Sequence, residues 1–302
     1  MPEHPATQTF LFWHRVRHRM RRILWKCAIL VVLLFFLFIT INAVRVASND
    51  RQWAPDHAVA PTVEIAAVGT TTLYIIDGVR MTDYTRKEPV VKRYQDHILT
   101  TDIVGMWYVV VPFAGFGAAH TFLSFEMEDG KFLSVSVEAR READEKYSPW
   151  LGLIDQYELI YVVAEERDII GRRVMVDKDP VYVYPTIATT KQSQQIFDGI
   201  MRRIARLEKT PESYDTIFNN CTTNLADHVN ATIGDGTVPW SSTLVMPKES
   251  DRYALSLGLL AIDPDTDIET ERKRHLVNEV ASSSISKVNF SKIIRESLKL
   301  YD

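Results

Sequence analysis

One short polar stretch of the sequence contains the residue best suited to covalent chemistry. The stretch Asn219-Asn220-Cys221-Thr222-Thr223-Asn224-Leu225 holds one of only two cysteines in the 302 residues. The residues that follow, up to Val229, predict a helix that begins after Asn220, because the side-chain oxygen of asparagine accepts an otherwise unbonded backbone N–H. A thiol in the first turn of a helix lies at the positive end of the helix dipole, which favours the thiolate. Cys221 is therefore a candidate nucleophile.

A different interpretation of Cys221 also stays open. Most lone cysteines are small buried hydrophobic residues without a chemical role. The other cysteine, Cys27, lies in an apolar run, which leaves Cys221 without a partner for an intramolecular disulfide. The polar neighbours of Cys221 argue against an apolar core, and an unpaired thiol in an oxidising compartment needs a reason.

A second informative stretch, His120 to Glu138, reads as two strands around Glu128-Asp129-Gly130. A two-residue turn would mix polar and apolar side chains on each face of the hairpin, because paired residues share a face. A three-residue loop, which pairs Met127 with Lys131, separates the two kinds. One face then holds Leu123, Phe125, Met127, Leu133, Val135 and Val137, and the other holds His120, Phe122, Ser124, Glu126, Phe132, Ser134, Ser136 and Glu138. We therefore predict the three-residue loop.

This register places His120 directly across from Glu138, with Ser136 diagonal to the histidine. A carboxylate beside a histidine fixes its tautomer and stabilises the imidazolium. A cross-strand ion pair on a hairpin surface is the simpler alternative. With a capped thiol in the same chain, we interpret Cys221, His120 and Glu138 as the candidate catalytic residues, and Asn220 and Ser136 as oxyanion or supporting residues.

Other kinds of site find little support in the sequence. No cluster of His, Cys and carboxylate residues has the spacing of a zinc site, and no phosphate-binding or dinucleotide fingerprint is present. We expect neither a metal nor a cofactor. His228 lies two helical turns after Cys221, about 10 Å away and too far for direct proton transfer. The histidines His57, His97 and His275 have no convincing partner in the sequence.

The remaining patterns predict the elements that would position these residues. Buried strands are expected at residues 105–111, 157–164, 169–176 and 181–186. Residues 191–208 form an amphipathic helical pattern, with Ile196, Phe197, Ile200, Met201, Ile204 and Leu207 on one stripe. The charged run 266–274 is expected to be solvated, and the amphipathic run 284–300 to pack on the domain or on a membrane. We expect an α+β fold in which an antiparallel sheet of five or six strands packs on the Cys221 helix.

The N-terminal residues predict a membrane anchor. Residues 1–26 contain six basic side chains and one acid, which leaves 29 basic and 38 acidic residues, a formal charge of −9, for the rest. Residues 27–44 carry no charge and would span about 27 Å as a helix. A cleaved signal peptide is the alternative, but Arg45 disfavours the obvious cleavage point. The basic cluster predicts a cytoplasmic N-terminus and an external domain, whose acidic charge disfavours nucleic-acid binding.

Several motifs together resemble one family. The segments His120-Thr121-Phe122-Leu123-Ser124-Phe125, Ser134-Val135-Ser136-Val137-Glu138-Ala139-Arg140-Arg141-Glu142, Tyr147-Ser148, Gln156-Tyr157-Glu158-Leu159-Ile160-Tyr161 and Asn219-Asn220-Cys221-Thr222-Thr223-Asn224 are similar to the Lnb N-terminal periplasmic domain family. The resemblance covers about residues 104–260. It implies a permuted papain-like (NlpC-like) fold, the superfamily that includes lecithin retinol acyltransferase. Under this resemblance His120 and Cys221 match the family histidine and cysteine. Lnb proteins carry several membrane helices after this domain, so the resemblance implies the thiol chemistry more directly than a lipoprotein substrate.

The resemblance implies a bacterial lipoprotein N-acyltransferase-like activity. We expect a cytoplasmic tail (1–26), a transmembrane helix (27–44), a stalk (45–62), a periplasmic thiol domain (63–262) and a charged C-terminal extension (263–302). The expected protein is a single-pass inner-membrane cysteine acyltransferase or hydrolase. It would form a thioester with an acyl group from phospholipid and pass it to a lipoprotein amine. The alternatives are a cysteine amidase or peptidase acting on cell-wall peptide, and a non-enzymatic anchored scaffold.

Overall fold

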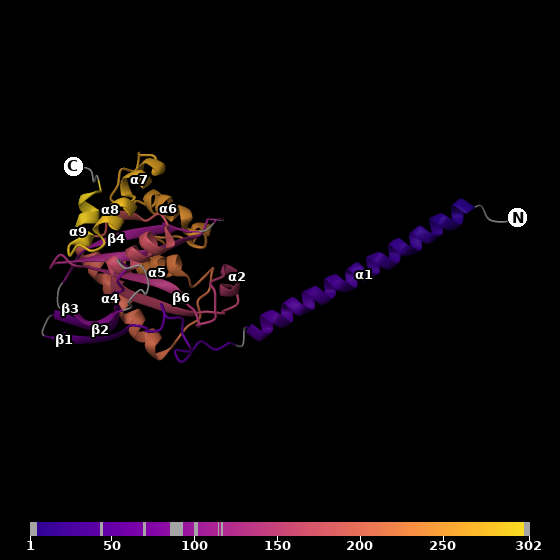
Figure 1. Cartoon of the computed structure of the whole chain (residues 1–302), viewed down its shortest axis with the longest axis horizontal. Coiled ribbons are helices and arrows are strands. Elements are labelled where there is room, and N and C mark those ends of the chain that lie inside the picture. Colours follow the sequence, from indigo (N-terminus) through magenta and orange to yellow (C-terminus); the bar gives the residue numbers. More distant parts are fainter. Residues whose placement is uncertain are drawn as a thin grey trace. The chain divides into compact units, whose positions relative to one another are not determined.

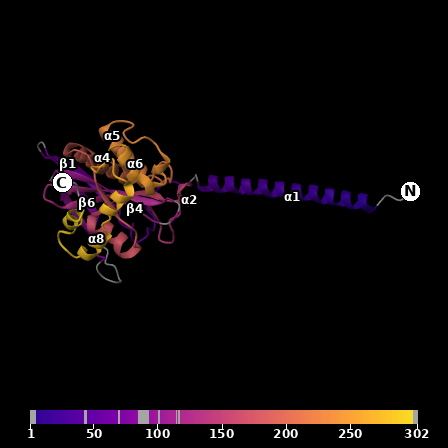
Figure 2. The ribbon, with the colours of Figure 1, turned by 90° about the horizontal axis from the view of Figure 1, so that it is seen from above.

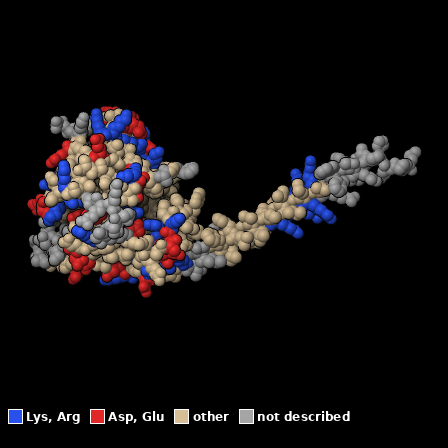
Figure 3. Space-filling view, in the orientation of Figure 1, with Lys and Arg blue, Asp and Glu red and all other residues tan. Residues whose placement is uncertain are grey.

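The computed structural model describes residues 5–42, 45–68, 71–84, 93–99, 102–113, 115 and 117–298. The chain divides into two compact units, Met1–Val46 and Ala47–Asp302. The first unit contains helix α1 (Pro5–Asn42). Its described basic side chains precede a stretch without Lys, Arg, Asp or Glu (Figure 3).

The structure does not confirm the predicted membrane span. Within the described residues, no helix has both the length and the hydropathy required to cross a bilayer. The predicted span 27–44 includes residues 39 and 41–44, whose side chains lie outside the described part of the chain.

The second unit is built on one large sheet (Figure 1). Among the described residues it has eight strands in the order β1-β2-β7-β6-β5-β4-β8, with β3 paired to β2 outside this path. The pairs are antiparallel except β2 with β7, which is parallel. The predicted α+β class is confirmed, but the expected antiparallel sheet of five or six strands is wrong in number and in direction at this one pair. The strands are β1 (Thr62–Val68), β2 (Thr71–Arg80), β3 (Tyr94–Leu99), β4 (Ile103–Pro112), β5 (Ala119–Met127), β6 (Phe132–Arg140), β7 (Glu158–Glu165) and β8 (Tyr182–Pro185).

The central hairpin β5–β6 has the predicted register. Phe122 pairs with Ser136, and Phe125 pairs with Leu133. The backbone N–H of Met127 donates to the carbonyl of Lys131 at 2.9 Å, and Gly130 adopts φ +77°, which glycine accepts without steric cost. The prediction holds because this register gathers Leu123, Phe125, Met127, Leu133, Val135 and Val137 on one face.

Helices cover both faces of the sheet. In Figure 2, α4, α5 and α6 lie on one side of the strands and α8 on the other. The first face packs on α4, whose predicted apolar stripe is buried from Ile196 to Leu207. The helices of this side are α2 (Pro149–Gly152), α4 (Thr190–Lys209), α5 (Cys221–Ile233) and α6 (Ser250–Ser256), with the short helices η2 (Ser242–Leu244) and η3 (Pro247–Glu249).

The second face carries its own apolar cluster, to which Phe122 contributes from β5. It packs on α3 (Glu166–Gly171), η1 (Arg172–Asp177), α8 (Asn278–Ser284) and α9 (Phe290–Glu296). The strand predicted at 169–176 is therefore wrong. Ile169, Ile170 and Val174 are buried at a spacing that suits one face of a helix, and packing on the sheet overrides their β-branched preference.

The C-terminal residues 263–298 also belong to the second unit. The charged run expected to be solvated forms α7 (Ile268–His275), in which Ile268, Glu271, Arg272 and His275 are buried. The expectation holds for Asp267, Glu269 and Lys273, which are exposed, but it is wrong for Glu271 and Arg272. These two have partners: Arg274 donates to Glu271 at 2.7 Å, and the guanidinium of Arg272 makes two contacts of 2.7 Å with the carboxylate of Asp251. A buried charge persists where it is paired and hydrogen-bonded.

Candidate active site

The first turn of α5 holds Cys221 in a fixed position. The side-chain oxygen of Asn220 accepts hydrogen bonds from the N–H groups of Thr222 and Thr223 at 2.8 and 2.9 Å, as the sequence predicts. Its Nδ2 donates to the carbonyls of Thr216 (2.8 Å) and Leu244 (3.0 Å). Both amide hydrogens of Asn220 are thus used structurally, so Asn220 supports the helix start and is not placed to donate to an oxyanion. The N–H of Cys221 itself lies in the first turn, where helix N–H groups have no intrahelical acceptor.

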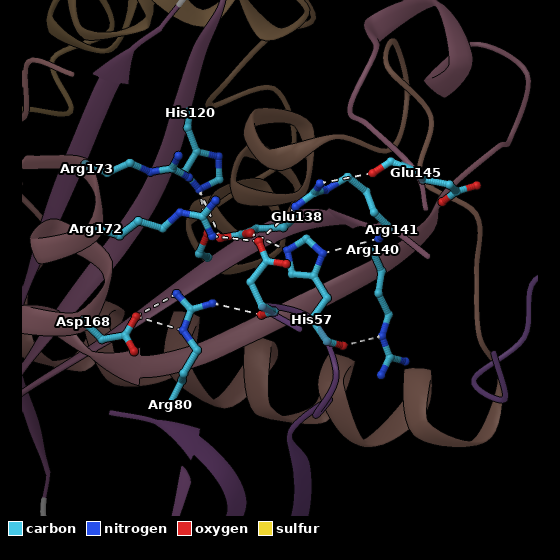
Figure 4. Close-up of polar contacts among 12 residues, drawn as sticks. His57, Arg80, His120, Glu138, Arg140, Arg141, Glu145, Asp168, Arg172 and Arg173 are labelled. Carbon is cyan, nitrogen blue, oxygen red and sulfur yellow. Dashed lines mark hydrogen bonds and ion pairs between the residues drawn. The ribbon is translucent and has the colours of Figure 1, made fainter. Parts of the chain in front are cut away.

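A hydrogen-bonded chain of three side chains extends from His120 to Glu138 (Figure 4). The Nε2 atom of His120 lies 2.6 Å from Ser136 Oγ, and Ser136 Oγ lies 2.8 Å from Glu138 Oε1. The direct distance from His120 Nε2 to Glu138 Oε1 is 3.8 Å. Glu138 therefore reaches the histidine mainly through Ser136, and the direct pairing expected from the register becomes a relay.

The donor and acceptor roles in this chain are fixed. Burial raises the pKa of Glu138, but the hydrogen bond and attraction of His57, together with His120 and Arg80, hold that pKa well below its usual range. An ionised carboxylate can only accept, so the Ser136 hydroxyl donates to Glu138. Its oxygen then accepts from His120 Nε2–H, which leaves His120 Nδ1 without a proton. That nitrogen has the lone pair a general base requires.

The imidazole of His120 is neutral over a wide pH range. Burial and the nearby charge of Arg173 lower its pKa to about 3, although Glu138 acts in the opposite direction. Arg172 and Arg80 add to the lowering. A neutral imidazole has the lone pair that accepts a proton, but its low pKa makes it a weak base. The positive charge that forms on it therefore depends on the nearby Glu138 carboxylate, which raises that pKa.

The thiol and the imidazole line one cavity of about 440 Å³. Strand β5, which carries His120, and helix α5, which carries Cys221, are in contact at the next residue of each. There the hydroxyl oxygens of Thr121 and Thr222 are 3.0 Å apart. Cys221 is 7% exposed, and its sulfur lies 3.6 Å from Thr222 Oγ1. The structure thus brings Cys221, His120 and Glu138 to a single cavity.

The comparison with protein families agrees with this geometry. Residues 91–246 match the family model of the Lnb N-terminal periplasmic domain. The chain belongs to the Lnb N-terminal periplasmic domain family. No curated protein and no solved structure matches the chain.

The Lnb match includes all five candidate site residues predicted from the sequence, but two residues that line the cavity lie outside it. His57 lies before the matched region, and its Nε2 is 2.9 Å from Glu138 Oε2. Sequence reasoning found no partner for His57, because the pair is separated by 81 positions and no periodic pattern connects them. The other histidines are elsewhere: His228 Nε2 contacts the Tyr161 hydroxyl at 3.0 Å, His275 contacts Glu271, and the side chain of His97 lies outside the described residues.

Sequence reasoning also missed the charged and phenolic lining of the cavity in this Lnb domain. Arg141, Arg172 and Arg173 line it with Asp56, Asp177 and Asp179, and Tyr147 and Tyr214 lie near Cys221. Asp56 pairs with Arg141 at 2.9 Å and with Arg172 at 2.8 Å. The motifs that contain Arg141 and Tyr147 were the available signals for this lining. Among the described residues, no group of three or more His, Cys, Asp or Glu side chains could hold a metal ion.

Proposed function

We propose that this chain is a membrane-anchored periplasmic cysteine acyltransferase or hydrolase that works through a thioester acyl-enzyme. The observation that carries the proposal is the shared cavity of the Cys221 thiol and a neutral His120 whose Nδ1 bears no proton. Membership of the Lnb family supports the periplasmic placement. Thiol and imidazole in one cavity, with the imidazole held by Ser136 and Glu138, form the arrangement of an activated nucleophile.

The proposed reaction has two transfers. His120 Nδ1 takes the proton of the Cys221 thiol, and the thiolate attacks the carbonyl carbon of an ester, forming a carbon–sulfur bond. The tetrahedral oxyanion is stabilised by the Cys221 N–H at the start of α5. It collapses as the carbon–oxygen bond breaks, and the leaving alkoxide takes the proton from His120. An amine or water then attacks the thioester, gives a proton to His120, and releases the Cys221 thiolate, which regains that proton.

An apolar pocket under the first turns of α5 supports an acyl chain as the transferred group. The pocket has a volume of about 90 Å³, and Thr222, the residue after Cys221, is one of its lining residues. Its walls include parts of α5, α6, β4 and β5 and are almost wholly apolar, with Met106, Leu123, Leu225, Val229, Ala254 and Leu257 among them. Apolar walls favour methylene groups over peptide groups by removing them from water.

A second candidate function, amide hydrolysis on cell-wall peptide, is supported by the charged lining of the cavity that holds Cys221. The cavity that holds Cys221 is lined by three arginines and by Asp177 and Asp179. Charged side chains of both signs suit a substrate that carries both carboxylate and amino groups. The chemistry of Cys221 and His120 would be the same, with an amine as the leaving group.

The chain before the domain supports a membrane location. The described side chains of α1 from Ile29 to Phe38 are large, apolar and exposed, and the described basic residues, up to Lys26, precede them. We propose that the chain continues this apolar stretch to about residue 44 as a single inner-membrane anchor with a cytoplasmic N-terminus. With this anchor, the domain would lie close to membrane phospholipid as the acyl donor and to a lipoprotein amine as the acceptor.

The decisive experiment is mass spectrometry of the purified full-length protein after incubation with phosphatidylethanolamine vesicles. We expect a long-chain acyl group on the peptide containing Cys221, removable by hydroxylamine, and none in Cys221→Ser or His120→Ala. Both variants should remain folded, which circular dichroism checks. Release of cell-wall peptide fragments without an acyl adduct would favour the second candidate. A thiol inert to alkylating reagents in the native protein would instead favour a non-enzymatic scaffold.

A further inference from the structure

The segment that precedes the first strand, residues 47–61, is held firmly against the domain; we call it the entry segment. The side-chain amide of Asn49 donates to the carbonyls of Leu207 and Glu208, each at 3.0 Å. Arg51 forms a 2.7 Å ion pair with Glu158. The N–H of Ala54 donates to the carbonyl of Arg141 at 2.9 Å. The region expected to be a stalk is thus part of the folded unit.

The entry segment also meets the last residues of β6. The guanidinium of Arg140 lies over the Trp53 ring at 4.0 Å, and its Nε donates to the carbonyl of His57 at 3.1 Å. These contacts fix the backbone of the entry segment next to the strand that carries Glu138. His57 is consequently 3% exposed.

The imidazole of His57 has a defined tautomer. Its Nδ1 accepts a hydrogen bond from the backbone N–H of Arg141 at 3.3 Å, and a backbone amide can only donate. The ring proton is therefore on Nε2, which donates to Glu138 Oε2 at 2.9 Å. Figure 4 shows the His57 ring and the His120 ring on either side of the Glu138 carboxylate.

Glu138 thus has a donor on each oxygen. Ser136 donates to Oε1 at 2.8 Å and His57 to Oε2 at 2.9 Å. With both oxygens occupied, the carboxylate has one orientation, and that orientation sets where Ser136 can accept from His120. Without His57, one oxygen of a largely buried carboxylate would have no partner, which is costly and allows the group to rotate.

We propose that His57 is a positioning residue of the thiol site, acting through Glu138 and Ser136 on the tautomer and orientation of His120. The proposal rests on the proposed function, because it assumes that His120 is the base for Cys221. It assigns a role to the entry segment, which directly follows the N-terminal unit and lies outside the Lnb match. The working site then includes residues upstream of the family domain.

The charges around the relay set the sign of the expected effect. His57, His120, Arg80 and Arg172 act electrostatically on Glu138, and Arg173, Arg172 and Arg80 act on His120. The hydrogen bond from His57 lowers the pKa of Glu138. Its removal should raise that pKa, so the ionised carboxylate, and with it the active relay, should be lost at a higher pH than in the wild type.

The test measures alkylation of Cys221 by iodoacetamide as a function of pH in the full-length protein carrying Cys27→Ser, so that one thiol reacts. We expect His57→Phe, which keeps an apolar ring but no donor, to slow alkylation by about 10- to 100-fold, the usual range for residues that orient a ligand or base. We also expect the acid limb of the pH–rate profile, the pH range in which alkylation slows on acidification, to lie at higher pH in His57→Phe than in the wild type. His57→Gln, whose amide can donate to Glu138, should restore most of the rate and the wild-type limb.

Two matched controls separate positioning from general stability. Arg51→Gln breaks another contact of the same entry segment, and His228→Gln alters a half-buried histidine outside the cavity. Both should leave the pH profile unchanged. A His57→Phe profile identical to the wild type, while His120→Ala is slow, overturns the role of His57 alone. An unchanged rate in His120→Ala overturns the proposed function itself.

A double variant keeps the test decisive if His57→Phe does not fold. His57→Phe with Glu138→Gln removes the buried charge together with its donor, so no carboxylate is left unpaired. If His57 acts through Glu138, this protein should react at the rate of Glu138→Gln alone. A further loss of tenfold or more would mean that His57 acts by another route, and would overturn the proposal.

Discussion

The Ser136 hydroxyl has a single proton, and its two neighbours decide where that proton goes. Glu138 is ionised and takes it, so the oxygen of Ser136 is left to accept from His120. A hydroxyl that donates to an anion becomes a stronger acceptor. Among the described residues, Ser136 Oγ lies 2.6 Å from His120 Nε2, whereas Glu138 Oε1 lies 3.8 Å from it. The negative charge of Glu138 therefore acts on His120 mainly through Ser136.

This relay changes the expected effect of mutating Ser136. The sequence register, which places Ser136 diagonal to His120, predicts that Ser136→Ala is milder than Glu138→Gln. The contacts instead predict similar losses in the rate of acyl-enzyme formation, on the order of 10²–10⁴-fold for each. The double variant should be little slower than either single one, because the two residues act as a unit.

Stopped-flow measurement of p-nitrophenol release from a p-nitrophenyl ester would determine these rates. Circular dichroism should show that Ser136→Ala and Glu138→Gln remain folded at the assay temperature, which serves as the control. Ser136→Ala should nevertheless unfold at a lower temperature than the wild type, because Glu138 Oε1 loses its donor. A Ser136→Ala enzyme close to the wild-type rate would mean that Glu138 contacts His120 directly during the reaction.

The pKa of His120 predicts the pH dependence of both reactivity and stability. Since that pKa is lowered to about 3, the imidazole remains an unprotonated base well below its usual pKa of about 6.5. The acid limb of Cys221 alkylation should therefore lie below pH 5 in the wild type. In the unfolded chain the same histidine binds a proton below about pH 6.5. The free energy of unfolding should accordingly fall as the pH decreases from about 6.5 towards 3.

Alkylation rates and urea unfolding between pH 3 and 8 measure the two parts of this prediction. His120→Ala removes the titrating group. The free energy of unfolding of this variant should therefore depend less on pH between about 6.5 and 3 than that of the wild type. An alkylation limb near pH 6.5 in the wild type would show that His120 titrates normally and that burial does not control it.

At the scale of single residues, the sequence predicted the site in part. Cys221, its Asn220 cap and the facing His120 and Glu138 follow from local patterns: a helix start and an alternating hairpin. His57 could not be found, because its contact with Glu138 spans 81 positions and depends on the path of an irregular segment. Long-range contacts of that kind leave no periodic signal in one sequence.

At the scale of elements, prediction succeeded where one periodicity was long and unbroken. Helix α4 was predicted almost to its ends, and the structure adds a capping box between Thr189 and Gln192. The segment 169–176 failed because its β-branched residues suggest a strand, whereas the burial of Ile169, Ile170 and Val174 follows a helical face. Short apolar runs carry both meanings, and only packing decides between them.

The pocket formed by α5, α6 and β4 can be tested by filling it. Ala254→Phe would occupy space that we assign to an acyl chain. We expect the kcat/KM for p-nitrophenyl decanoate to fall by about tenfold or more, because several methylene groups lose their apolar contacts. The value for p-nitrophenyl acetate should stay close to the wild type, since Cys221 and His120 are untouched.

Ala231→Phe is the matched control, because Ala231 is exposed on α5 and does not line the pocket. It should change neither ester. Equal losses on both esters in Ala254→Phe would indicate a disturbed α5, whereas no loss on either would place the acyl chain elsewhere.

At the scale of the whole domain, the sheet is covered on both faces. The sequence predicted the first cover in detail and the second only through the amphipathic run 284–300, whose described part packs on the domain. The apolar face of the hairpin and the stripe of α4 predicted the first core. The second core was harder to predict, because its strand face is mixed and its cover combines α3 and η1 with residues 277–298. Buried charges in this cover, such as Arg295, are paired, and pairing partners cannot be read from composition.

Mutation of the ion pair between Arg295 and Glu166 tests whether the C-terminal residues are an integral part of the domain. Arg295 contacts both carboxylate oxygens of Glu166 at 2.7 Å, and its guanidinium lies between the rings of Trp107 and Phe132. The Ser124 hydroxyl on β5 donates to the same carboxylate at 2.6 Å. Helix α9 is thereby tied to the strand that carries His120.

Arg295→Met should keep the apolar contacts but leave the Glu166 charge buried without its cation, lowering the free energy of unfolding by about 3–5 kcal/mol. Adding Glu166→Gln should recover much of that loss, because no unpaired charge remains. Urea unfolding of the full-length protein, followed by tryptophan fluorescence and by Cys221 accessibility, measures both. We expect the two signals to shift together, since the second core and the thiol site share one sheet. A transition in which residues 263–298 detach first, while Cys221 keeps its wild-type protection, would instead make the C-terminal residues a separate extension.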